Sequence, residues 1–272
     1  MDRLVRIFDL LVSNKKIKIT MLAELLDVSQ VTLRRDLDIL EERGIVCRTH
    51  GYASLDGADS TGKRLAYNHL IKRKIAKAAV QTIEDGESVM IESGSCCALF
   101  AEELVLAHKN ATIITNSLFI KNYISKLSGI NLIILGGIFQ PESQVLVGPM
   151  TKHSAKSIFT NKYFLGTDGF IPAQGFTGRD QLRIDTAQEL AKSANEVFIL
   201  TESDKFLRHG AYSLLQFDSI TGVFTDDKIS KEAEAALLKN NVRLHKVPYA
   251  EEKIKWRQFP GQPPFLYKEK EE

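Results

Sequence analysis

Apolar and polar positions in the first part of the chain have the spacing of a small helical domain. Apolar residues recur at the i, i+3, i+4 spacing between Leu4 and Val12, which predicts an amphipathic helix there. Residues 17–19 alternate between apolar and polar and predict a brief strand. Thr20 is then expected to cap a short helix that ends at Leu26.

A second, longer helix is predicted after a three-residue turn. Residues 27–29 form the turn, and Ser29 at its end is a favoured N-cap residue. The helix is expected to run to Arg43, with Gly44 in the favoured position just beyond its end. Two short helices joined in this way have helix-turn-helix geometry. Residues 45–52 follow as a candidate hairpin strand or wing.

The pattern changes beyond residue 53. Residues 53–63 are rich in Gly, Ser, Asp and Thr, which indicates an interdomain linker, and a helix is predicted over about residues 67–83. Short apolar runs then alternate with helical stretches, which predicts crossover units and a mainly parallel sheet covered on both faces. The seven expected strands are 88–91, 112–115, 131–135, 163–165, 197–200, 222–225 and 242–247.

These patterns predict an α/β chain with two domains, as its 272 residues also favour. The expected parts are a winged helix-turn-helix at 1–53, a linker at 54–66, a mainly parallel α/β domain at 67–248, and an irregular tail at 249–272 that Trp256 and Phe259 could anchor.

The cysteines and the apolar runs bear on the compartment. Cys47, Cys96 and Cys97 show no disulfide framework and no zinc spacing, and the adjacent pair cannot form an ordinary bridge. No uninterrupted apolar run reaches about 18 residues, and charges in the first turn do not fit a signal peptide. We therefore expect a cytoplasmic protein without a metal or cofactor.

Charge alone says little about partners. The net charge is +2, and residues 1–52 hold nine Lys and Arg against eight Asp and Glu. The prediction of DNA binding therefore depends on how the side chains are arranged on the predicted second helix. On a helical wheel Leu33, Leu37 and Leu40 form a buried stripe, Arg35 points away from it, and Arg34 lies on a flank.

The exposed side of this helix carries residue types that bind DNA. Gln30 and Thr32 lie in its first turn, the part of a recognition helix that reaches base edges. Guanidinium groups suit guanine and phosphates, and a Gln amide suits adenine. Asp36 and Asp38 would repel phosphate, so we expect them to orient the arginines or face away. The candidate DNA-contacting residues are Ser29, Gln30, Thr32, Arg34, Arg35, Arg48 and His50. Spacing alone leaves open a helical bundle with a solvated charged face.

The second helix and the wing resemble the signature of the DeoR family of bacterial transcription regulators. The matching residues are VSQVTLRRDL at 28–37, LEERG at 40–44 and RTHG at 48–51. In that family this segment is the recognition helix and wing of a repressor's DNA-binding domain, so the resemblance implies double-stranded DNA as a partner. Tyr52 departs from the pattern, because the family usually has a second Gly there.

Three places in the larger domain have the chemistry of a ligand site. Residues 92–97 follow an expected strand and open a helix, where Gly, hydroxyls and backbone N–H groups could hold an anion. Residues 115–117 follow another strand, and residues 166–169 and 202–206 follow two more. The carboxyl ends of parallel strands gather around a ligand crevice. An ordinary turn at the first place and a helix N-cap at the second are the alternatives.

The resemblance to the DeoR family continues through these places and covers about residues 1–247. Its further blocks are 115–117, 135–137, 147–149, 165–169 and 203–206. That family's effector domain is similar in fold to ribose-5-phosphate isomerase and binds phosphorylated sugars as inducers. Carried over by position, the resemblance implies that phosphate is held by Ser93, Gly94, Ser95, Cys96 and Cys97, and that the sugar is contacted by Asn116, Asp168 and Lys205.

Two departures affect this expectation. Cys96 and Cys97 stand where the family usually has threonines, which removes two donors; small apolar fillers facing the helix interior are the alternative. Asp185 matches an acidic residue of the family, whereas Ala187 replaces a lysine. The resemblance therefore implies a sugar phosphate without indicating which sugar.

The sequence thus predicts a repressor of a carbohydrate-utilisation operon that a phosphorylated sugar releases from its operator. One winged helix covers only a few base pairs, so we expect a homodimer or larger homo-oligomer held chiefly by the larger domain. The alternative is a sugar-phosphate isomerase-like enzyme with a helical appendage, in which Asp168, Asp185 and Lys205 would supply acid–base chemistry. No further nucleophile or metal constellation accompanies them, so we expect no catalytic residues. A non-DNA interaction module would leave Gln30 and Arg35 without a purpose.

Overall fold

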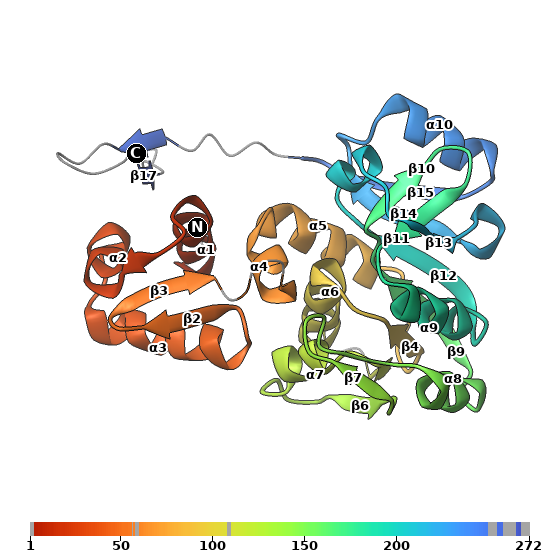
Figure 1. Ribbon diagram of the computed structural model, residues 1–272, viewed down its shortest axis with the longest axis horizontal. Coiled ribbons are helices and arrows are strands. Elements are labelled where there is room, and N and C mark those ends of the chain that lie inside the picture. Colours follow the sequence, from red (N-terminus) through yellow and green to blue (C-terminus); the bar gives the residue numbers. More distant parts are fainter. Residues whose placement is uncertain are drawn as a thin grey trace. The chain divides into compact units, whose positions relative to one another are not determined.

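The computed structural model describes residues 3–55, 57, 60–107, 110–249, 255–257 and 265–267. The chain divides into two compact units, Met1–Leu70 with Ala250–Glu272 and Ile71–Tyr249, which are coloured along the sequence in Figure 1. The division falls inside helix α5 (His69–Val80).

The first unit has the order of elements expected of a winged helix-turn-helix, which confirms the predicted fold of this part. Its three strands form an antiparallel sheet in the order β1-β3-β2. The elements are α1 (Arg3–Ser13), β1 (Ile17–Lys18), α2 (Ile19–Leu26), α3 (Gln30–Glu42), β2 (Val46–Thr49), β3 (Tyr52–Leu55) and α4 (Thr61–Ala66). The capping role predicted for Thr20 is wrong, because α2 begins at Ile19 with Lys18 in the cap position and without a side-chain cap.

The core of this unit is made by the apolar stripes that the periodicity predicts. Ile7 and Phe8 of α1 are fully buried, and so are Leu33, Leu37 and Leu40 of α3. Each such side chain stabilises the fold by about 1.5–3 kcal/mol through removal from water. The opposite side of α3 is thereby left to solvent.

The expected linker at 54–66 is more ordered than its composition suggests. Leu55 still belongs to β3, and residues 61–66 form the helix α4. Ser60 caps this helix, since its hydroxyl accepts a hydrogen bond from the Lys63 amide at 3.1 Å. Leu65 is fully buried, so part of the segment packs as structure instead of spanning between domains.

The second unit is built on a seven-stranded sheet in which all neighbours run parallel, as predicted. The strand order is β15-β14-β12-β9-β4-β5-β6. The strands are β4 (Ser88–Ile91), β5 (Thr112–Thr115), β6 (Asn131–Ile134), β9 (Thr160–Leu165), β12 (Ala194–Leu200), β14 (Gly222–Asp226) and β15 (Arg243–Val247). All seven predicted runs are strands of this sheet.

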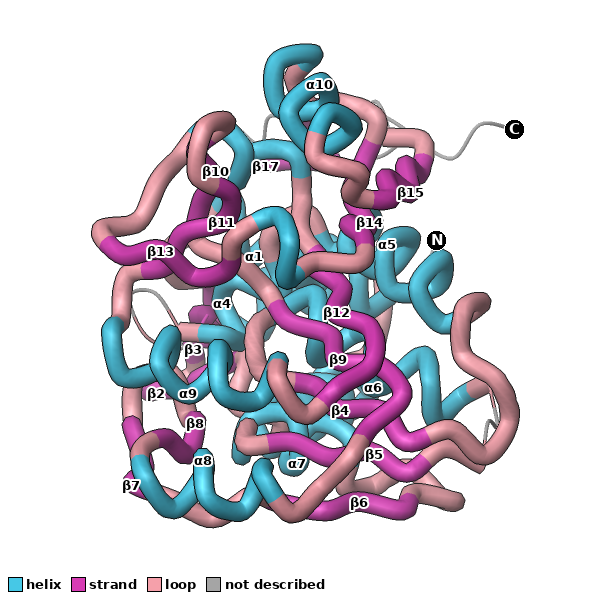
Figure 2. Tube along the Cα trace, turned by 90° about the vertical axis from the view of Figure 1, so that its right-hand side faces the viewer, coloured by secondary structure: helices cyan, strands magenta, loops and turns pink. Residues whose placement is uncertain are grey.

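Helices cover both faces of the sheet. Figure 2 shows α8 and α9 on one side and α5, α6 and α7 on the other. The bounds are α6 (Ser95–Leu106), α7 (Leu118–Ile124), α8 (Pro149–Lys156), α9 (Gln181–Ala191) and α10 (Lys231–Lys239). Met90, Tyr163 and Ile199 meet α8 and α9 in one core cluster, while Phe164 faces Phe100 of α6, ring centroids 4.2 Å apart.

Several short elements were not predicted. They include a three-stranded antiparallel sheet, the hairpin β7–β8, and a 3₁₀ turn, η1. Their bounds are β7 (Ile138–Gln140), β8 (Val145–Val147), β10 (Gly169–Ile171), β11 (Gly175–Gly178), β13 (Tyr212–Leu215) and η1 (Ser203–Leu207). Runs of three or four residues with glycines are too short to show a clear alternation.

The tail differs from the expected irregular segment. Lys255–Arg257 (β16) pairs antiparallel with Phe265–Tyr267 (β17). The proposed anchors cannot be placed, because Phe259 and the side chain of Trp256 lie outside the described part of the chain.

Candidate functional site

The start of α3 is organised by the residue predicted to cap it. The Ser29 hydroxyl accepts a hydrogen bond from the Thr32 amide at 3.1 Å and lies 2.9 Å from the Thr32 hydroxyl. Gln30 is exposed beside this pair. The cap fixes the helix start and leaves Gln30 available to a ligand.

The solvent side of α3 presents the arginines that the wheel predicts. Arg34 and Arg35 are exposed. Val31 was missed by the sequence reasoning, although 60% of it is exposed at the start of this helix. An exposed valine between Gln30 and Thr32 fits a thymine methyl group, the apolar feature of the major groove. The signal available in the sequence was an apolar residue outside the buried stripe.

The acidic residues of α3 are occupied by arginines from other elements. Asp36 accepts a hydrogen bond from Arg3 at 3.0 Å. Asp38 lies 2.7 Å from Arg48 of β2. The two aspartates therefore do not orient Arg34 and Arg35, which was one of the two expectations for them.

The wing candidate Arg48 is held against α3. Its Nε donates to Glu41 at 2.9 Å, and its backbone amide donates to the other oxygen of the same carboxylate at 3.0 Å. The side-chain hydrogen bond from Arg48 lowers the pKa of Glu41. The Arg48 guanidinium thus ties the wing to the helix, and a phosphate would have to compete with two carboxylates for it.

The tip of the wing is a two-residue turn. Thr49 pairs with Tyr52, and the residues between them, His50 and Gly51, have φ of 50° and 79°. Two positive φ angles define a type I′ turn, which matches the twist of a hairpin and favours Gly. This geometry leaves the candidate His50 exposed at the tip.

The candidate effector residues lie after the carboxyl ends of the central strands. The strand order reverses between β4 and β9, the kind of position at which open α/β sheets bind ligands. Ser93 follows β4 and is 3% exposed, and Asn116 follows β5 and is 1% exposed. Gly94 is the N-cap of α6, with φ 106° and no capping side chain.

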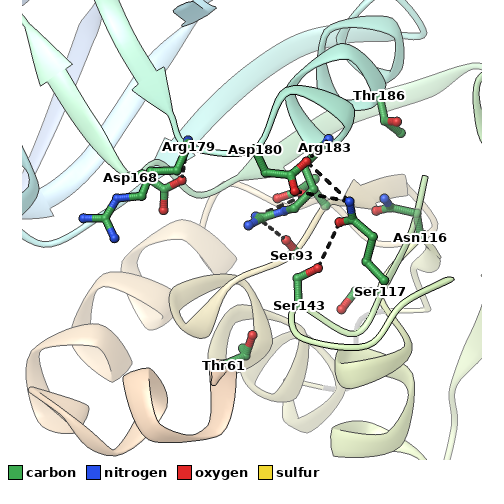
Figure 3. A network of polar contacts seen from close by, with 12 residues as sticks. Thr61, Ser93, Asn116, Ser117, Ser143, Asp168, Arg179, Asp180, Arg183 and Thr186 are labelled. Atoms are coloured by element: carbon green, nitrogen blue, oxygen red, sulfur yellow. Dashed lines mark hydrogen bonds and ion pairs between the residues drawn. The ribbon is translucent and has the colours of Figure 1, made fainter. Parts of the chain in front are cut away.

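Arg183 of α9 reaches this edge, as Figure 3 shows, and was not predicted. Its Nη2 donates to the Ser93 hydroxyl at 3.0 Å and lies 3.6 Å from the Glu92 carboxylate. Burial opposes its charge, but the carboxylates of Glu92, Asp168 and Asp180 outweigh burial and raise the pKa of Arg183. Its buried Nε has no hydrogen-bond partner among the described residues.

Asn116 offers a second unsatisfied polar atom. Its amide nitrogen donates to the Leu146 carbonyl at 2.8 Å, which fixes the side chain. Its oxygen is buried, and in the part of the chain that the structure describes it has no partner. A buried acceptor left unpaired costs about 1–3 kcal/mol, so a ligand hydroxyl here would be favourable.

Asp168 is positioned by the backbone that follows β11. One of its carboxylate oxygens accepts a hydrogen bond from the Arg179 amide at 3.0 Å. Asp180, which follows Arg179 in the chain, caps α9 by accepting a hydrogen bond from the Arg183 amide at 2.8 Å. It also accepts a hydrogen bond from the side-chain amide of Gln140 at 3.2 Å. Figure 3 shows Asp168 beside Arg179, and Asp180 between Arg179 and Arg183.

Lys205 lies on η1 and is half-buried beside a buried ion pair. Lys72 of α5 is 3.1 Å from Glu202, and the Cys96 thiol is 3.8 Å from the same carboxylate. Glu202 belongs to the predicted segment 202–206, but Lys72 and its pairing with Glu202 were missed, because residues 130 positions apart carry no local signal of contact.

The two cysteines are interior residues of α6. Cys96 is 5% exposed and Cys97 is fully buried. Burial raises the pKa of both thiols, so they remain protonated at neutral pH. Their contact with a phosphate stays a prediction, whereas Ser93 and Gly94 lie where a ligand at the strand ends could meet them.

The described residues contain neither a group of three His, Cys, Asp or Glu that could hold a metal nor a helix long and apolar enough to cross a membrane. A helix-turn-helix with exposed arginines and an α/β unit with buried, unpaired polar atoms at its strand ends define a DNA-binding regulator with a sensor domain. Comparison with known proteins agrees. Residues 3–58 match the DeoR-like helix-turn-helix domain and residues 67–227 match the DeoR C-terminal sensor domain. The chain belongs to the DeoR family of transcriptional regulators and is not an enzyme.

Two relatives and one solved structure illustrate the similarity. The lactose phosphotransferase system repressor of Lactococcus lactis subsp. lactis is 32% identical over 240 residues, 85% of this chain and 92% of that protein. The L-fucose operon activator of Escherichia coli (strain K12) is 28% identical over 228 residues, 82% and 93% of the two chains. Ribose 5-phosphate isomerase A from Methanocaldococcus jannaschii aligns with a TM-score of 0.38 and 21% identity, over 51% of this chain and 55% of that one. A likeness of that extent defines neither activity nor ligand.

Proposed function

We propose that this protein represses a carbohydrate-utilisation operon and is released from its operator by a phosphorylated sugar. The observation that carries the proposal is the pair of buried polar atoms without described partners on Arg183 and Asn116, beside the strand ends at the reversal of strand order. The names of the two relatives, which concern lactose and fucose, support a sugar as the signal. A regulator that binds an operator acts in the cytoplasm.

The two halves of such a ligand would be bound by different groups. The phosphate would lie at the uncapped start of α6, against the Ser93 hydroxyl and the Arg183 guanidinium, where N–H groups and positive charge favour an anion. The sugar hydroxyls would meet the free oxygen of Asn116, the carboxylate of Asp168 and the ammonium group of Lys205. Carboxylate and amide oxygens accept hydroxyl protons, and the ammonium group donates.

Release of DNA requires that the ligand favour one arrangement of the regulator over another. A coupling free energy of about 1–3 kcal/mol is typical, which corresponds to a roughly 5- to 150-fold loss of operator affinity. The same factor must appear in reverse, because DNA then weakens effector binding equally. This reciprocity is measurable with the intact protein.

We further propose that the protein acts as a homodimer or a larger homo-oligomer held by the second unit. The free edge strand β6 supports this, because Ile133 and Ile134 are 42% and 37% exposed, and Ile138 and Phe139 of the following hairpin are 58% and 47% exposed. Exposed apolar edges of this kind are usually covered by another chain. Sedimentation of a monomer at micromolar concentration, with and without DNA, would refute this proposal.

The central test is an anisotropy titration of a labelled duplex from the region upstream of the protein's own operon. Each of a panel of sugar phosphates is added, paired with the same sugar without phosphate. We expect one phosphorylated member to release the duplex and its unphosphorylated partner to be without effect. Release by the free sugar would contradict the phosphate assignment, tighter binding with the sugar phosphate would indicate an activator, and no response to any member would contradict the proposed signal.

A further inference from the structure

Lys16, Lys18 and Tyr52 lie together on the edge of the small sheet. Strand β1 pairs with β3 so that Lys18 stands opposite Tyr52. The Lys16 ammonium lies 4.4 Å from the centroid of the Tyr52 ring, and that of Lys18 lies 6.0 Å from it. Ammonium groups within about 6 Å of an aromatic face are attracted to it. We call these three residues the wing-base patch.

The chain segments that form the wing-base patch carry positively charged residues and no acidic ones. Residues 10–23 contain three lysines, the third being Lys15, and no acidic residue. Residues 44–55, which include the whole wing, also contain no acidic residue. Lys15, Lys16 and Lys18 are all exposed. Local charge at this edge is therefore unlike the near-neutral balance of the whole domain.

The lysines of the wing-base patch differ from the arginines of the same unit in their partners. Arg3 and Arg48 are bound by carboxylates of α3. Across the described ranges of the chain, by contrast, Lys16 and Lys18 form no ion pair. Their charge is available to an external anion.

The wing-base patch adjoins the elements that would meet DNA. The amide of Ile19, the first residue of α2, donates to the Gly51 carbonyl in the wing turn at 3.0 Å. This bond fixes β1 and the start of α2 against the turn that presents His50. A duplex touching the wing tip would thus have its phosphates next to Lys18.

We infer that the wing-base patch binds the phosphate backbone of the operator, with Tyr52 holding the Lys16 ammonium in place. This inference rests on the DNA-binding function and adds a phosphate-binding site outside the recognition helix and the wing tip. Contacts of this kind position a protein on the duplex without reading its sequence. The ring at position 52, where a glycine would leave Lys16 unsupported, restricts a side chain that otherwise has many rotamers.

Salt dependence separates this role from that of a merely solvated surface. The full-length protein is titrated with the upstream duplex and with a duplex of random sequence, between about 50 and 200 mM salt. Replacing either lysine by glutamine should make the slope of log affinity against log salt shallower by about one, because one counterion fewer is released. At about 0.15 M salt both duplexes should bind about fivefold more weakly.

Matched variants define the outcomes. Lys16→Arg should restore the slope, and Lys239→Gln, an exposed charge on α10, should leave it unchanged. Tyr52→Phe should bind both duplexes like the wild type, whereas Tyr52→Leu should weaken both. Unchanged slopes in Lys16→Gln and Lys18→Gln would overturn the inference, and so would a loss confined to the upstream duplex, since that would mean base reading. A wild type that binds neither duplex would overturn the DNA-binding function as well.

Discussion

Arg48 of the wing and Glu41 of the recognition helix are joined through three hydrogen bonds to one carboxylate, two from the side chain and one from the backbone. The hairpin is thus fastened to α3 by a charge pair as well as by its apolar residues. Arg48 was predicted to contact DNA, and its position now gives it a structural role that can be tested apart from DNA binding.

Glu41→Gln should destabilise the first unit at neutral pH by about 0.5–1 kcal/mol, the upper range for an exposed ion pair. The pKa of Glu41 is lowered in the folded protein, so this contribution is present above the ordinary carboxyl pKa of about 4.3 and is lost as pH falls through the lower folded value. Urea unfolding should therefore show a larger difference between the variant and the wild type at pH 7 than near pH 3.5. Glu24→Gln, which changes an exposed residue of α2, is the control and should behave like the wild type at both pH values.

Arg35→Ala should weaken binding to the preferred site by about 1–3 kcal/mol and reduce discrimination there, because the exposed guanidinium lies on the reading side of α3. Binding to the upstream duplex and to a random duplex is compared. An equal loss on both would make Arg35 a phosphate contact, and no loss on either would refute the assignment of α3 as the reading helix.

Lys205→Ala should keep the operator affinity of the wild type and require far more effector for release. Lys205 is half-buried on η1 beside a buried ion pair. Packing of apolar side chains does not explain a charged residue at this position, whereas binding of a ligand does. Release of the labelled duplex by the active sugar phosphate is the measurement. Lys192→Gln, at the end of α9, is the matched change of an exposed charge. A wild-type response from Lys205→Ala would show that the pocket lies elsewhere.

Arg183→Gln should raise the concentration of sugar phosphate needed for release by about tenfold or more, since a charge-assisted bond to an anion is worth about 1.5–3 kcal/mol. Thermal unfolding must be followed in parallel, because Glu92 would be left buried without its partner. Arg183→Lys, which keeps the charge, should be intermediate. Equal effector sensitivity in all three proteins would remove Arg183 from the phosphate site.

Local patterns of apolar and polar residues predicted much of the fold. The seven strands of the parallel sheet were predicted because each contains a short apolar run, and the helix-turn-helix because Ser29 and Gly44 bracket a clear 3.6-residue period. The strands β10 and β11 were missed because they form a hairpin of only three or four residues a strand with glycines in it, and β13 was missed because it pairs with β11 from more than thirty residues away.

The candidate effector site was predicted only in part, for a similar reason. Residues immediately after strands, such as Ser93 and Asn116, are recognisable by their position. Arg183 lies on a helix ninety positions away from Ser93 in the sequence, and the residues next to Arg183 in the chain give no indication of that contact. Lys72 and Glu202 are likewise paired only by the fold.

The difference in sequence separation between the two sites has a consequence for synthesis on the ribosome. The helix-turn-helix and its wing close through contacts within the first 55 residues, of which the Ile17–Ala53 pairing is among the longest. The proposed effector site draws on Ser93, Arg183 and Lys205, so it cannot be complete until about three quarters of the chain has emerged. A nascent or truncated chain would therefore be able to bind DNA well before it could respond to the effector that releases it.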